Sequence, residues 1–553
     1  MKPHGTRLFV QLLHGGREQI ASAPRPPAVA PSAVPSQRFR VEPRALRDEE
    51  IESIVAGFAR AAGLAARAGL DGIEISAAHN YLVAQFFDPE INRRTDRWGE
   101  PHAFLLAVLM AVREAAAKLA IGVRLSADCG PAREVVGELR GRADYIHLAV
   151  GDSSTYLGSI GIVPPPPTDE NECAKWTEPF HVGPPVIATS RIVDPEAADR
   201  LIADGVADAV GMNRALITDP DLPRKAREGR TDRVLRCLAC NACIAHYHAE
   251  TPIACAQNPR TGRERTLPLP ERAERSLRLV VVGAGPAGLA AAVEAGRSGH
   301  SVVLLERSPR IGGQVALAGA APGHAELAAA LERNYAMLLE EADVELRLDE
   351  EADADSVEAL APDAVVAATG ARPYASPRTF DGVRVLYAWD VLLGPVPEGG
   401  RVVVADWGGD PAGFDAAELL ADAGCDVTLA LASVTAGESM HQYQRNLYLA
   451  RFARLGVRLE HHVEAVDARD GAVRLASIFA PDVERDLPAD TLVLALGRVP
   501  QGGLADELRA RGLVVEEAGD VLSPRSIEEA ILEGTLAARS VTDQVGEARA
   551  ARR

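Results

Sequence analysis

The sequence predicts an α/β protein in which a (β/α)8-type barrel precedes a cysteine-rich segment and a two-dinucleotide, Rossmann-like module. Three observations support this fold class. Short apolar runs alternate with amphipathic stretches over residues 1–232, four cysteines cluster after them, and a glycine fingerprint between two apolar runs opens the second half. Strands that alternate with helices pair in parallel, so the first stretch predicts one barrel-like parallel sheet.

Length and composition narrow the class of protein further. A chain of 553 residues is too long for one core and suggests three or four domains. It contains no run of about 18 apolar residues, so we expect no transmembrane span. The net charge of -19 argues against nucleic acid or an anionic membrane as partner. The absence of a secretory signal and the low cysteine content predict a reducing, cytoplasmic setting.

The predicted barrel contains fewer strands than a complete one. The six apolar runs predicted as strands are residues 8–13, 72–75, 122–125, 145–148, 186–188 and 207–210, and the main helical patterns cover 50–68, 101–117 and 195–203. A (β/α)8 barrel has eight strands, so we interpret the sequence as a barrel with a truncated or late-assigned start. The proline-rich segment 24–35 is predicted to be a long loop, either a lid or a passive linker.

Four cysteines form the most distinctive motif. Cys237, Cys240, Cys243 and Cys255 have the spacing C-x2-C-x2-C-x11-C. Three close thiolates and one distant thiolate are the arrangement that gathers around an iron–sulfur cluster. A tetrahedral zinc site can also take four thiolates, and a pair of disulfides suits a reducing setting poorly. The spacing therefore predicts a metal centre and leaves iron or zinc open.

The second half of the chain opens with a complete dinucleotide-binding signature. Gly283, Gly285 and Gly288 form G-x-G-x-x-G between an apolar run and a helical pattern, and Glu306 lies 23 residues beyond the first glycine. The glycines permit a tight turn and close approach of a pyrophosphate to a helix amino terminus, while the carboxylate can accept the ribose hydroxyls. We therefore predict a nucleotide site here.

Later glycine-marked segments predict a two-dinucleotide fold similar to that of flavoprotein disulfide reductases, in which one half interrupts the other. The residues that mark the first half are Gln314, Thr369, Gly370, Gly519 and Asp520. In the second half Gly408 and Gly413 remain, but Asp410 stands where the middle glycine belongs. A carboxylate there would repel a pyrophosphate, so this site is predicted to be degenerate.

These signals set the expected domain boundaries. The expected parts are a partial (β/α) barrel (1–232), the cysteine segment and linker (233–275), the first part of the first nucleotide half (276–392), the degenerate NAD-like half (393–498), and a return to the first half with a terminal helix (499–553).

The order of these parts resembles the old yellow enzyme-like iron–sulfur flavoproteins, the group with 2,4-dienoyl-CoA reductase and trimethylamine dehydrogenase. The resemblance covers the whole chain and rests on QLLHGGR, the block from IEISAAHNYL to RTDRWGE, GVRLS, TSRI, GMNRALITDP, the cysteine run, GAGPAG and PRSIEEA. It implies FMN in the barrel, a [4Fe-4S] cluster on the cysteines, and FAD or only its ADP portion at the first nucleotide site.

The resemblance also implies the residues of the flavin site. Gln11 resembles the side chain that hydrogen-bonds the pyrimidine edge of FMN, and Arg124 matches the arginine that stabilises the anionic reduced flavin. Arg191 and the stretch from Gly211 to Arg214 resemble the phosphate-binding ends of the last two strands.

On the substrate side the family presents three residues above the flavin, here Ser76, His79 and Tyr81. Relatives place histidine or tyrosine at the first position, so Ser76 departs from both patterns. His79 is expected to donate a hydrogen bond or relay a proton, and Tyr81 to act as acid/base. Asp152 loosely matches the active-site aspartate of the amine dehydrogenases. His147 is expected to be a packed or hydrogen-bonded barrel histidine.

The resemblance implies an oxidoreductase that moves two electrons at FMN and passes them singly through the cluster. The favoured direction is oxidation of a small amine, such as an N-methylated one, with an acceptor protein as partner. The alternatives are reduction of an activated alkene by NAD(P)H through FAD, and a catalytically incomplete electron-transfer or nucleotide-binding remnant. A homo-oligomeric state is left open.

Overall fold

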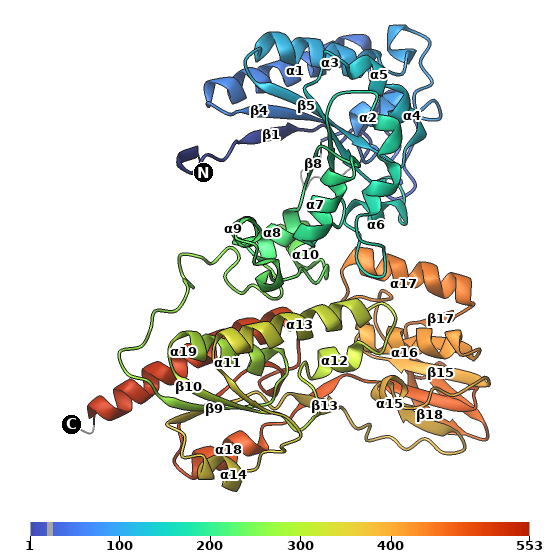
Figure 1. The fold of residues 1–553 in the computed structure, drawn as a ribbon. Helices are drawn as coiled ribbons and strands as arrows, with labels where there is room; N and C mark the ends of the chain where they lie inside the picture. Colours follow the sequence, from blue (N-terminus) through green and yellow to red (C-terminus); the bar gives the residue numbers. More distant parts are fainter. Residues whose placement is uncertain (1, 19–25, 552–553) are drawn as a thin grey trace. The chain divides into compact units, whose positions relative to one another are not determined.

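The computed structural model describes residues 2–18 and 26–551. The chain divides into two compact units, Met1–Asn213 and Arg214–Arg553, which are drawn from blue to red along the sequence in Figure 1. Each unit has its own sheets and its own hydrophobic core. The two units are therefore described separately.

The first unit is built on one parallel sheet with the strand order β1-β4-β5-β6-β7-β8. Its strands are β1 (Phe9–Leu12), β4 (Gly72–Ala77), β5 (Ala120–Ser126), β6 (Tyr145–Ala149), β7 (Val186–Ala188) and β8 (Ala209–Val210). Strands that follow one another in this order are also neighbours in the sheet, as in a (β/α) barrel. The prediction of six parallel strands is confirmed.

Helices pack on this sheet because each has one apolar face. The helices are α1 (Asp48–Arg67), α2 (Leu82–Phe87), α3 (Ala103–Ala115), α4 (Gly130–Glu134), α5 (Val136–Leu139), α6 (Gly158–Ile162) and α7 (Pro195–Ala203). In α1, Ile51, Phe58 and Ala62 are buried at helical spacing. All six residues of β4 are buried, as expected for a strand covered on both faces.

The proline-rich segment is a loop with one short pairing. Val29–Ala30 (β2) pairs in parallel with Arg44–Ala45 (β3). Residues 24 and 25 of the predicted segment lie outside the described residues. The segment follows β1 and therefore lies at the carboxyl end of the parallel sheet, where barrel active sites are built.

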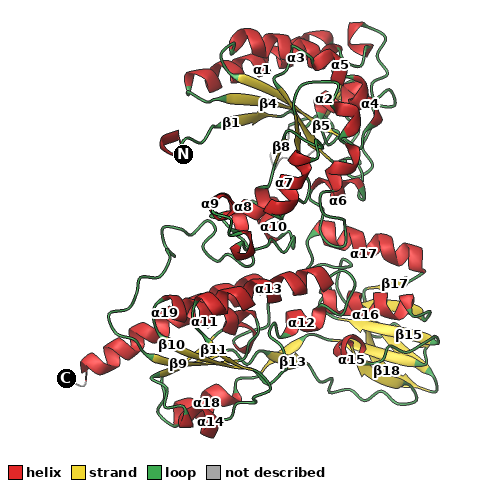
Figure 2. Ribbon diagram, viewed as in Figure 1, coloured by secondary structure: helices red, strands yellow, loops and turns green. Residues whose placement is uncertain are grey.

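The second unit begins with the cysteine segment, most of which is loop in Figure 2. Its helices are α8 (Asn213–Thr218), which starts one residue before the division, α9 (Leu222–Arg227) and α10 (Ala242–His248), with a 3-10 turn at Thr231–Arg233. Leu238 is buried in the same core as the first nucleotide half. The cysteine segment therefore folds as part of this unit.

The first nucleotide half is a five-stranded parallel sheet with the order β11-β10-β9-β12-β23. Its strands are β9 (Arg278–Val282), β10 (Ser301–Leu305), β11 (Glu345–Arg347), β12 (Ala364–Ala367) and β23 (Val515–Glu517), and its helices are α11 (Pro286–Arg297), α12 (Gln314–Ala318), α13 (Ala325–Glu341), α14 (Ala354–Ala359), α18 (Gly503–Ala510) and α19 (Ile527–Ala551). Because β23 pairs with β12 after the chain has formed another sheet, one half is inserted into the other.

The inserted half has its own parallel sheet with the order β14-β21-β15-β16-β17. Its strands are β14 (Arg384–Tyr387), β15 (Arg401–Asp406), β16 (Asp426–Leu431), β17 (Arg458–His461) and β21 (Thr491–Ala495); an antiparallel layer of β18 (Val463–Arg469), β19 (Ala472–Ser477) and β20 (Glu484–Pro488) packs against it. The helices are α15 (Ala388–Leu393), α16 (Pro411–Asp422) and α17 (Gln442–Leu455), and β13 (Ala371–Pro373) pairs with β22 (Arg498–Pro500) where the halves join. The predicted fold class is confirmed.

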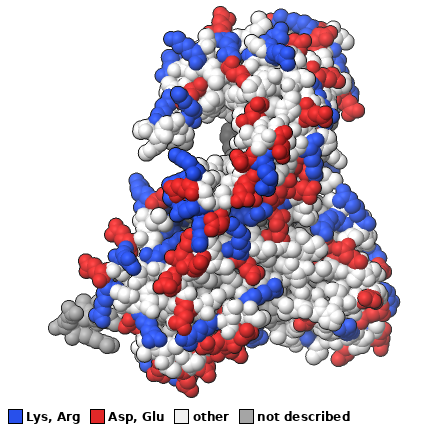
Figure 3. All heavy atoms as spheres, in the orientation of Figure 1, with Lys and Arg blue, Asp and Glu red and all other residues white. Residues whose placement is uncertain are grey.

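Charge and helix length complete the description. On the face drawn in Figure 3, acidic and basic side chains are interleaved, so the acidic excess does not form one patch there. Within the described part of the chain, every helix is too short or too polar to cross a membrane.

Candidate active site and nucleotide sites

The carboxyl end of β4 is fixed by hydrogen bonds to the ends of the next two strands. His79 and Asn80 have left-handed φ values of 57° and 62°, a costly conformation for residues other than glycine. The His79 N–H donates to Ser126 Oγ (2.8 Å), and the Ser153 N–H donates to the His79 carbonyl (3.1 Å). The strain is therefore held in place by β5 and β6.

His79 is a buried and neutral histidine with one free ring nitrogen to offer. Its Nδ1 lies 3.2 Å from the Gly151 carbonyl, which can only accept, so Nδ1 carries the proton and Nε2 is left as an acceptor. Burial, with the nearby Arg124 charge, lowers the His79 pKa to about 3. His79 therefore donates its one ring N–H to the Gly151 carbonyl and has no second N–H to donate to a substrate.

Tyr81 and Ser76 lie in the same site as His79. The Tyr81 ring is half-buried and meets the His79 ring edge-on, with centroids 6.1 Å apart. Ser76 is buried and lies opposite Arg124 in the register of β4 and β5. The structure brings these predicted residues together; their catalytic roles stay predictions.

Glu74 organises the interior of the sheet and was not predicted as a site residue. Its carboxylate accepts hydrogen bonds from Gln11 Nε2 (2.7 Å), His147 Nδ1 (2.7 Å) and the Tyr145 hydroxyl (3.3 Å). Burial alone would raise the Glu74 pKa, but the bonds and charges of His147, Gln11 and Arg124 hold it below its usual value. Glu74 is thus an anion in the sheet interior, and His147 is hydrogen-bonded as expected.

Two polar atoms beside Glu74 are buried without a partner. Arg124 Nε and His147 Nε2 have no hydrogen bond in the described structure. Buried polar groups are normally satisfied, so these atoms fit a polar ring such as the pyrimidine of FMN. Gln11, which is exposed on β1, could complete that contact.

The predicted phosphate-binding residues separate into two environments. Arg191 is buried just after β7 with a φ of 61°, and Gly211 follows β8, where a Cβ would come within 2.5 Å of Thr189 Cγ2. Arg214 lies in the second unit, and its Nη1 donates to Asn241 Oδ1 (2.7 Å) next to the cysteines. The phosphate roles of these residues stay predictions.

Carboxylates gather at the carboxyl end of the barrel sheet. Asp152 accepts from the Ser154 N–H and hydroxyl (both 2.8 Å), and it forms a parallel bridge with His79. Asp128 accepts from the Gly151 N–H (2.9 Å), and burial raises its pKa. Burial also raises the pKa of Glu18 to about 7, opposed by the adjacent Arg17. A cationic ligand bound at this end of the sheet would favour the ionised forms of these carboxyl groups.

At the first nucleotide site the three glycines of the fingerprint have different structural roles. Gly283 has a φ of 99°, and a Cβ on it would lie 2.4 Å from the Ala368 carbonyl. A Cβ on Gly288 would lie 1.8 Å from the Gly283 carbonyl, so glycine is required for packing. A Cβ on Gly285 would meet no atom within 4 Å. Only Gly285 faces open space, which is where a pyrophosphate would approach.

The cavity of this site has a volume of about 830 Å³ and includes every residue predicted for it except Gly288 and Gly519. Glu306 accepts from the N–H groups of Ala284 (2.7 Å) and Ser308 (2.8 Å). At the other end Arg498, which was not predicted, donates to Gln314 Oε1 (2.8 Å) and to Asp520 Oδ2 (2.5 Å). A cavity of this size and polarity fits a dinucleotide or its ADP portion.

The turn of the second nucleotide half is occupied by the protein's own carboxylates. Asp410 caps α16, and its Oδ1 accepts the Ala412 N–H (2.9 Å). Asp406 is buried beneath the turn and accepts the Gly409 N–H (2.8 Å). The Ser439 hydroxyl donates to the Gly409 carbonyl (3.0 Å), so a later loop lies against the turn. The residues present do not fit a pyrophosphate.

The four predicted cysteines lie together in the second unit. Burial and the nearby charges of the other three thiols raise the Cys240 pKa. Among the described residues, no three His, Cys, Asp or Glu side chains converge enough to hold a single metal ion. The spacing of the four cysteines is the one that gathers around an iron–sulfur cluster. The Ala239 N–H (3.4 Å from Cys237 Sγ) and Thr218 Oγ1 (3.6 Å from Cys255 Sγ) supply polar contacts that such a cluster uses.

Comparison with known proteins matches both parts of the chain. The model of the NADH:flavin oxidoreductase / NADH oxidase family matches residues 1–145 and 165–233, and the pyridine nucleotide-disulphide oxidoreductase model matches 277–527. An NADH oxidase of Thermoanaerobacter brockii is 32% identical, over 96% of this chain and 84% of its own. An N,N-dimethylglycine/sarcosine dehydrogenase of Chromohalobacter salexigens is 32% identical, over 80% of this chain and 69% of its own.

A solved structure supports the same assignment for the whole fold. The 6-hydroxypseudooxynicotine amine oxidase of Pseudomonas geniculata N1 aligns with a TM-score of 0.89 and 26% identity, over 97% of this chain and 85% of its own. This chain is therefore an oxidoreductase that belongs to the NADH:flavin oxidoreductase / NADH oxidase family, with flavin- and nucleotide-binding domains of the kinds that its sequence predicts.

Proposed function

We propose that this protein oxidises a small amine, such as an N-methylated amino acid, at FMN and passes the electrons through a [4Fe-4S] cluster to an acceptor protein. The observation that carries the direction is the second nucleotide half. Asp410 occupies the amino terminus of α16, where the pyrophosphate of NAD(P)H would bind, and Asp406 lies beneath it. Electrons therefore have no nicotinamide route at this half.

The carboxyl end of the barrel sheet supports an amine as substrate. Asp152 forms a bridge with His79, and Asp128 and His79 both hydrogen-bond Gly151, so two carboxyl groups lie beside the histidine. A protonated amine would be attracted there, the Tyr81 side chain in its phenolate form would take the proton, and His79 Nε2 would accept a hydrogen bond from the substrate. When FMN is bound, it supplies a two-electron acceptor beside Arg124. Oxidation of an N-methyl group followed by addition of water yields the demethylated amine, formaldehyde, two electrons and two protons.

Two similar proteins oxidise amines, according to their names. One is a dehydrogenase of dimethylglycine and sarcosine, and the other is an amine oxidase. The cysteines support the cluster, because four thiols with the spacing C-x2-C-x2-C-x11-C lie close together in the fold. The residues that would hold it are Cys237, Cys240, Cys243 and Cys255.

The alternative is an NAD(P)H-dependent reductase of activated alkenes. It is favoured by the similarity to an NADH oxidase and by the intact first nucleotide site, which would hold FAD. In that case NAD(P)H would have to reach a flavin without using the turn at Asp410.

The first test is the cofactor content of the protein purified without oxygen. We expect FMN, FAD or ADP, and four irons with four sulfides per chain, measured by chromatography of the released nucleotides and by colorimetry. Zinc in place of iron would contradict the proposed cluster. An intact cluster with no FMN would instead indicate an electron-transfer remnant without catalytic activity.

A further inference from the structure

We infer that Asn334, on α13 of the first nucleotide half, is the positioning residue that brings Cys255 to the other three cysteines. The inference rests on the proposed cluster and concerns what assembles it. Cys237, Cys240 and Cys243 are close in sequence, but eleven residues, which include most of α10, separate Cys243 from Cys255. The chain at Cys255 must therefore be held against the chain at Cys237 for the four thiols to meet.

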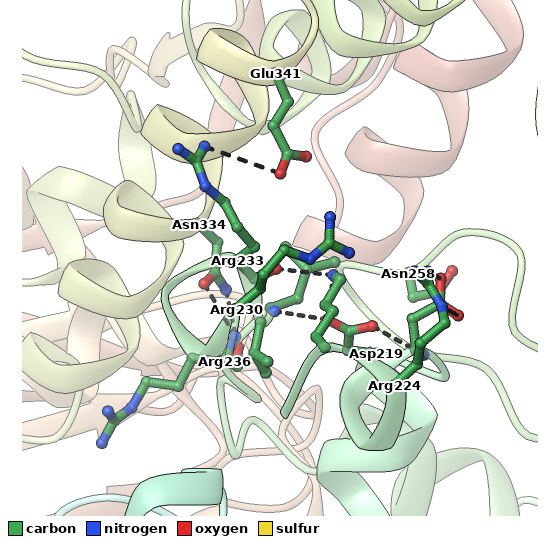
Figure 4. Close-up of polar contacts among 12 residues, drawn as sticks. Asp219, Arg224, Arg230, Arg233, Arg236, Asn258, Asn334 and Glu341 are labelled. Atoms are coloured by element: carbon green, nitrogen blue, oxygen red, sulfur yellow. Dashed lines mark hydrogen bonds and ion pairs between the residues drawn. The ribbon is translucent and has the colours of Figure 1, made fainter. Parts of the chain in front are cut away.

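Asn334 is completely buried, and its side chain makes every hydrogen bond available to an amide. Its Oδ1 accepts from the Arg236 N–H (3.0 Å) and from Arg333 Nη1 (3.1 Å). Its Nδ2 donates to the Arg236 carbonyl (2.8 Å) and to Gln257 Oε1 (3.0 Å). Figure 4 shows Asn334 pointing from its helix to the chain at Arg236. An amide has two donors and two acceptor positions, and all four are used here.

Two partners of Asn334 lie beside the two ends of the stretch from Cys237 to Cys255. Arg236 precedes Cys237, and Gln257 is two residues beyond Cys255. Gln257 Nε2 also donates to the Arg236 carbonyl (2.6 Å), which closes a triangle of three residues. The first and last cysteines are therefore held together through one amide of a helix that belongs to a different part of the fold.

A simple packing role would not require this residue. Leucine has a similar volume, and a buried amide is favourable only when its hydrogen bonds are satisfied. The neighbouring contacts point the same way: Arg333 Nη1 donates to the Val234 carbonyl (2.9 Å), and Asp219 accepts the Leu235 N–H (2.9 Å). The chain just before Cys237 is thus fixed from two sides.

The decisive variant is Asn334→Asp, which keeps the shape and the acceptor but loses both donors. We expect a ferrous chelator to bleach the cluster about 10-fold or more faster than in the parent, as for other residues that orient metal ligands. The milder Gln257→Glu removes only the bond to the Arg236 carbonyl and should give an intermediate rate. If Asn334→Asp fails to fold, the bleaching rate of Gln257→Glu tests the inference in its place.

The matched control is Thr535→Val, which removes another buried hydrogen bond of the same unit, from Thr535 Oγ1 to the Ile531 carbonyl (2.8 Å). It should lower the thermal midpoint without changing the bleaching rate. Bleaching of Asn334→Asp and Gln257→Glu at the parental rate would overturn the inference.

Hydrogen exchange separates this inference from the proposed function. The hydrogen bonds that join Asn334, Arg236 and Gln257 form a clamp on the two ends of the cysteine segment. Loss of this clamp should increase amide exchange at residues 234–238 and 255–258 in Asn334→Asp but not in Thr535→Val. If the parent binds no iron, the proposed cluster is wrong, and equal exchange in parent and Asn334→Asp would overturn the clamp as well.

Discussion

At the scale of single residues, Asp406 shows how a buried carboxyl group can be kept in its neutral form beneath the turn of the second nucleotide half. It lies at the end of β15 with 1% of its surface exposed. Burial, reinforced by Asp410, raises its pKa to about 8. The folded protein therefore keeps this group protonated at neutral pH, whereas in the unfolded chain it ionises near pH 3.8.

This difference predicts that Asp406→Asn stabilises the protein, and more so at pH 8 than at pH 5. Between these values the unfolded chain is already ionised while the folded chain is still protonated, so each pH unit costs the wild type about 1.4 kcal/mol. The cost reaches its limit above about pH 8. The thermal midpoints of both proteins at the two pH values measure the effect. The exposed Asp422→Asn should show none, and an equal gain at pH 5 and pH 8 would contradict the assignment.

Other decisive residues could not be predicted from the sequence. Glu74 is one acidic residue inside an apolar strand, a pattern that indicates an outward-facing side chain. Its partners Gln11 and His147 lie 63 and 73 residues away, so only the sheet register reveals the contact. Arg498 was missed for the same reason, since Gln314 is 184 residues distant. His79, Tyr81 and the cysteines could be named as candidates because local motifs mark them, and their roles stay predictions.

At the scale of elements, the turn between β9 and α11 separates the needs of folding from those of binding. Gly288 allows the helix to approach the strand, while Gly285 borders only the cavity. Periodicity and glycine spacing were enough to predict this turn, because its geometry is local. The carboxylate cap of α16 could be predicted in the same way, from Asp410 in the place of a glycine.

Gly285→Ala and Gly288→Ala should therefore fail differently. Gly285→Ala should keep the thermal midpoint of the nucleotide-free parent and lose nucleotide affinity by about 10-fold or more, since a lost contact of about 1.4 kcal/mol is sufficient. Gly288→Ala should lower stability by about 1–3 kcal/mol through overpacking. Bound nucleotide per chain and the thermal midpoint measure the two effects. Retention of nucleotide by a folded Gly285→Ala protein would contradict the site.

At the scale of the whole molecule, the predicted order of barrel, cysteine segment and nucleotide halves is the order found. The apolar runs predicted the strands because parallel strands are buried on both faces. The association of the cysteine segment with the first nucleotide half was not predicted, because Asn334 contacts residues about 80 to 100 positions away. The cysteine segment contacts helix α13 of the same unit, so the content of the proposed cluster should report the folding of the second unit.

The most direct test of the account is anaerobic mixing of the oxidised protein with N-methylated amines and, separately, with NADH and NADPH. We predict that sarcosine or a related amine bleaches the flavin absorbance and releases formaldehyde, with the cluster reduced afterwards. NADH and NADPH should leave the flavin oxidised on the same timescale. Rapid bleaching by either nicotinamide, with no reaction with any amine, would contradict the proposed direction of electron flow.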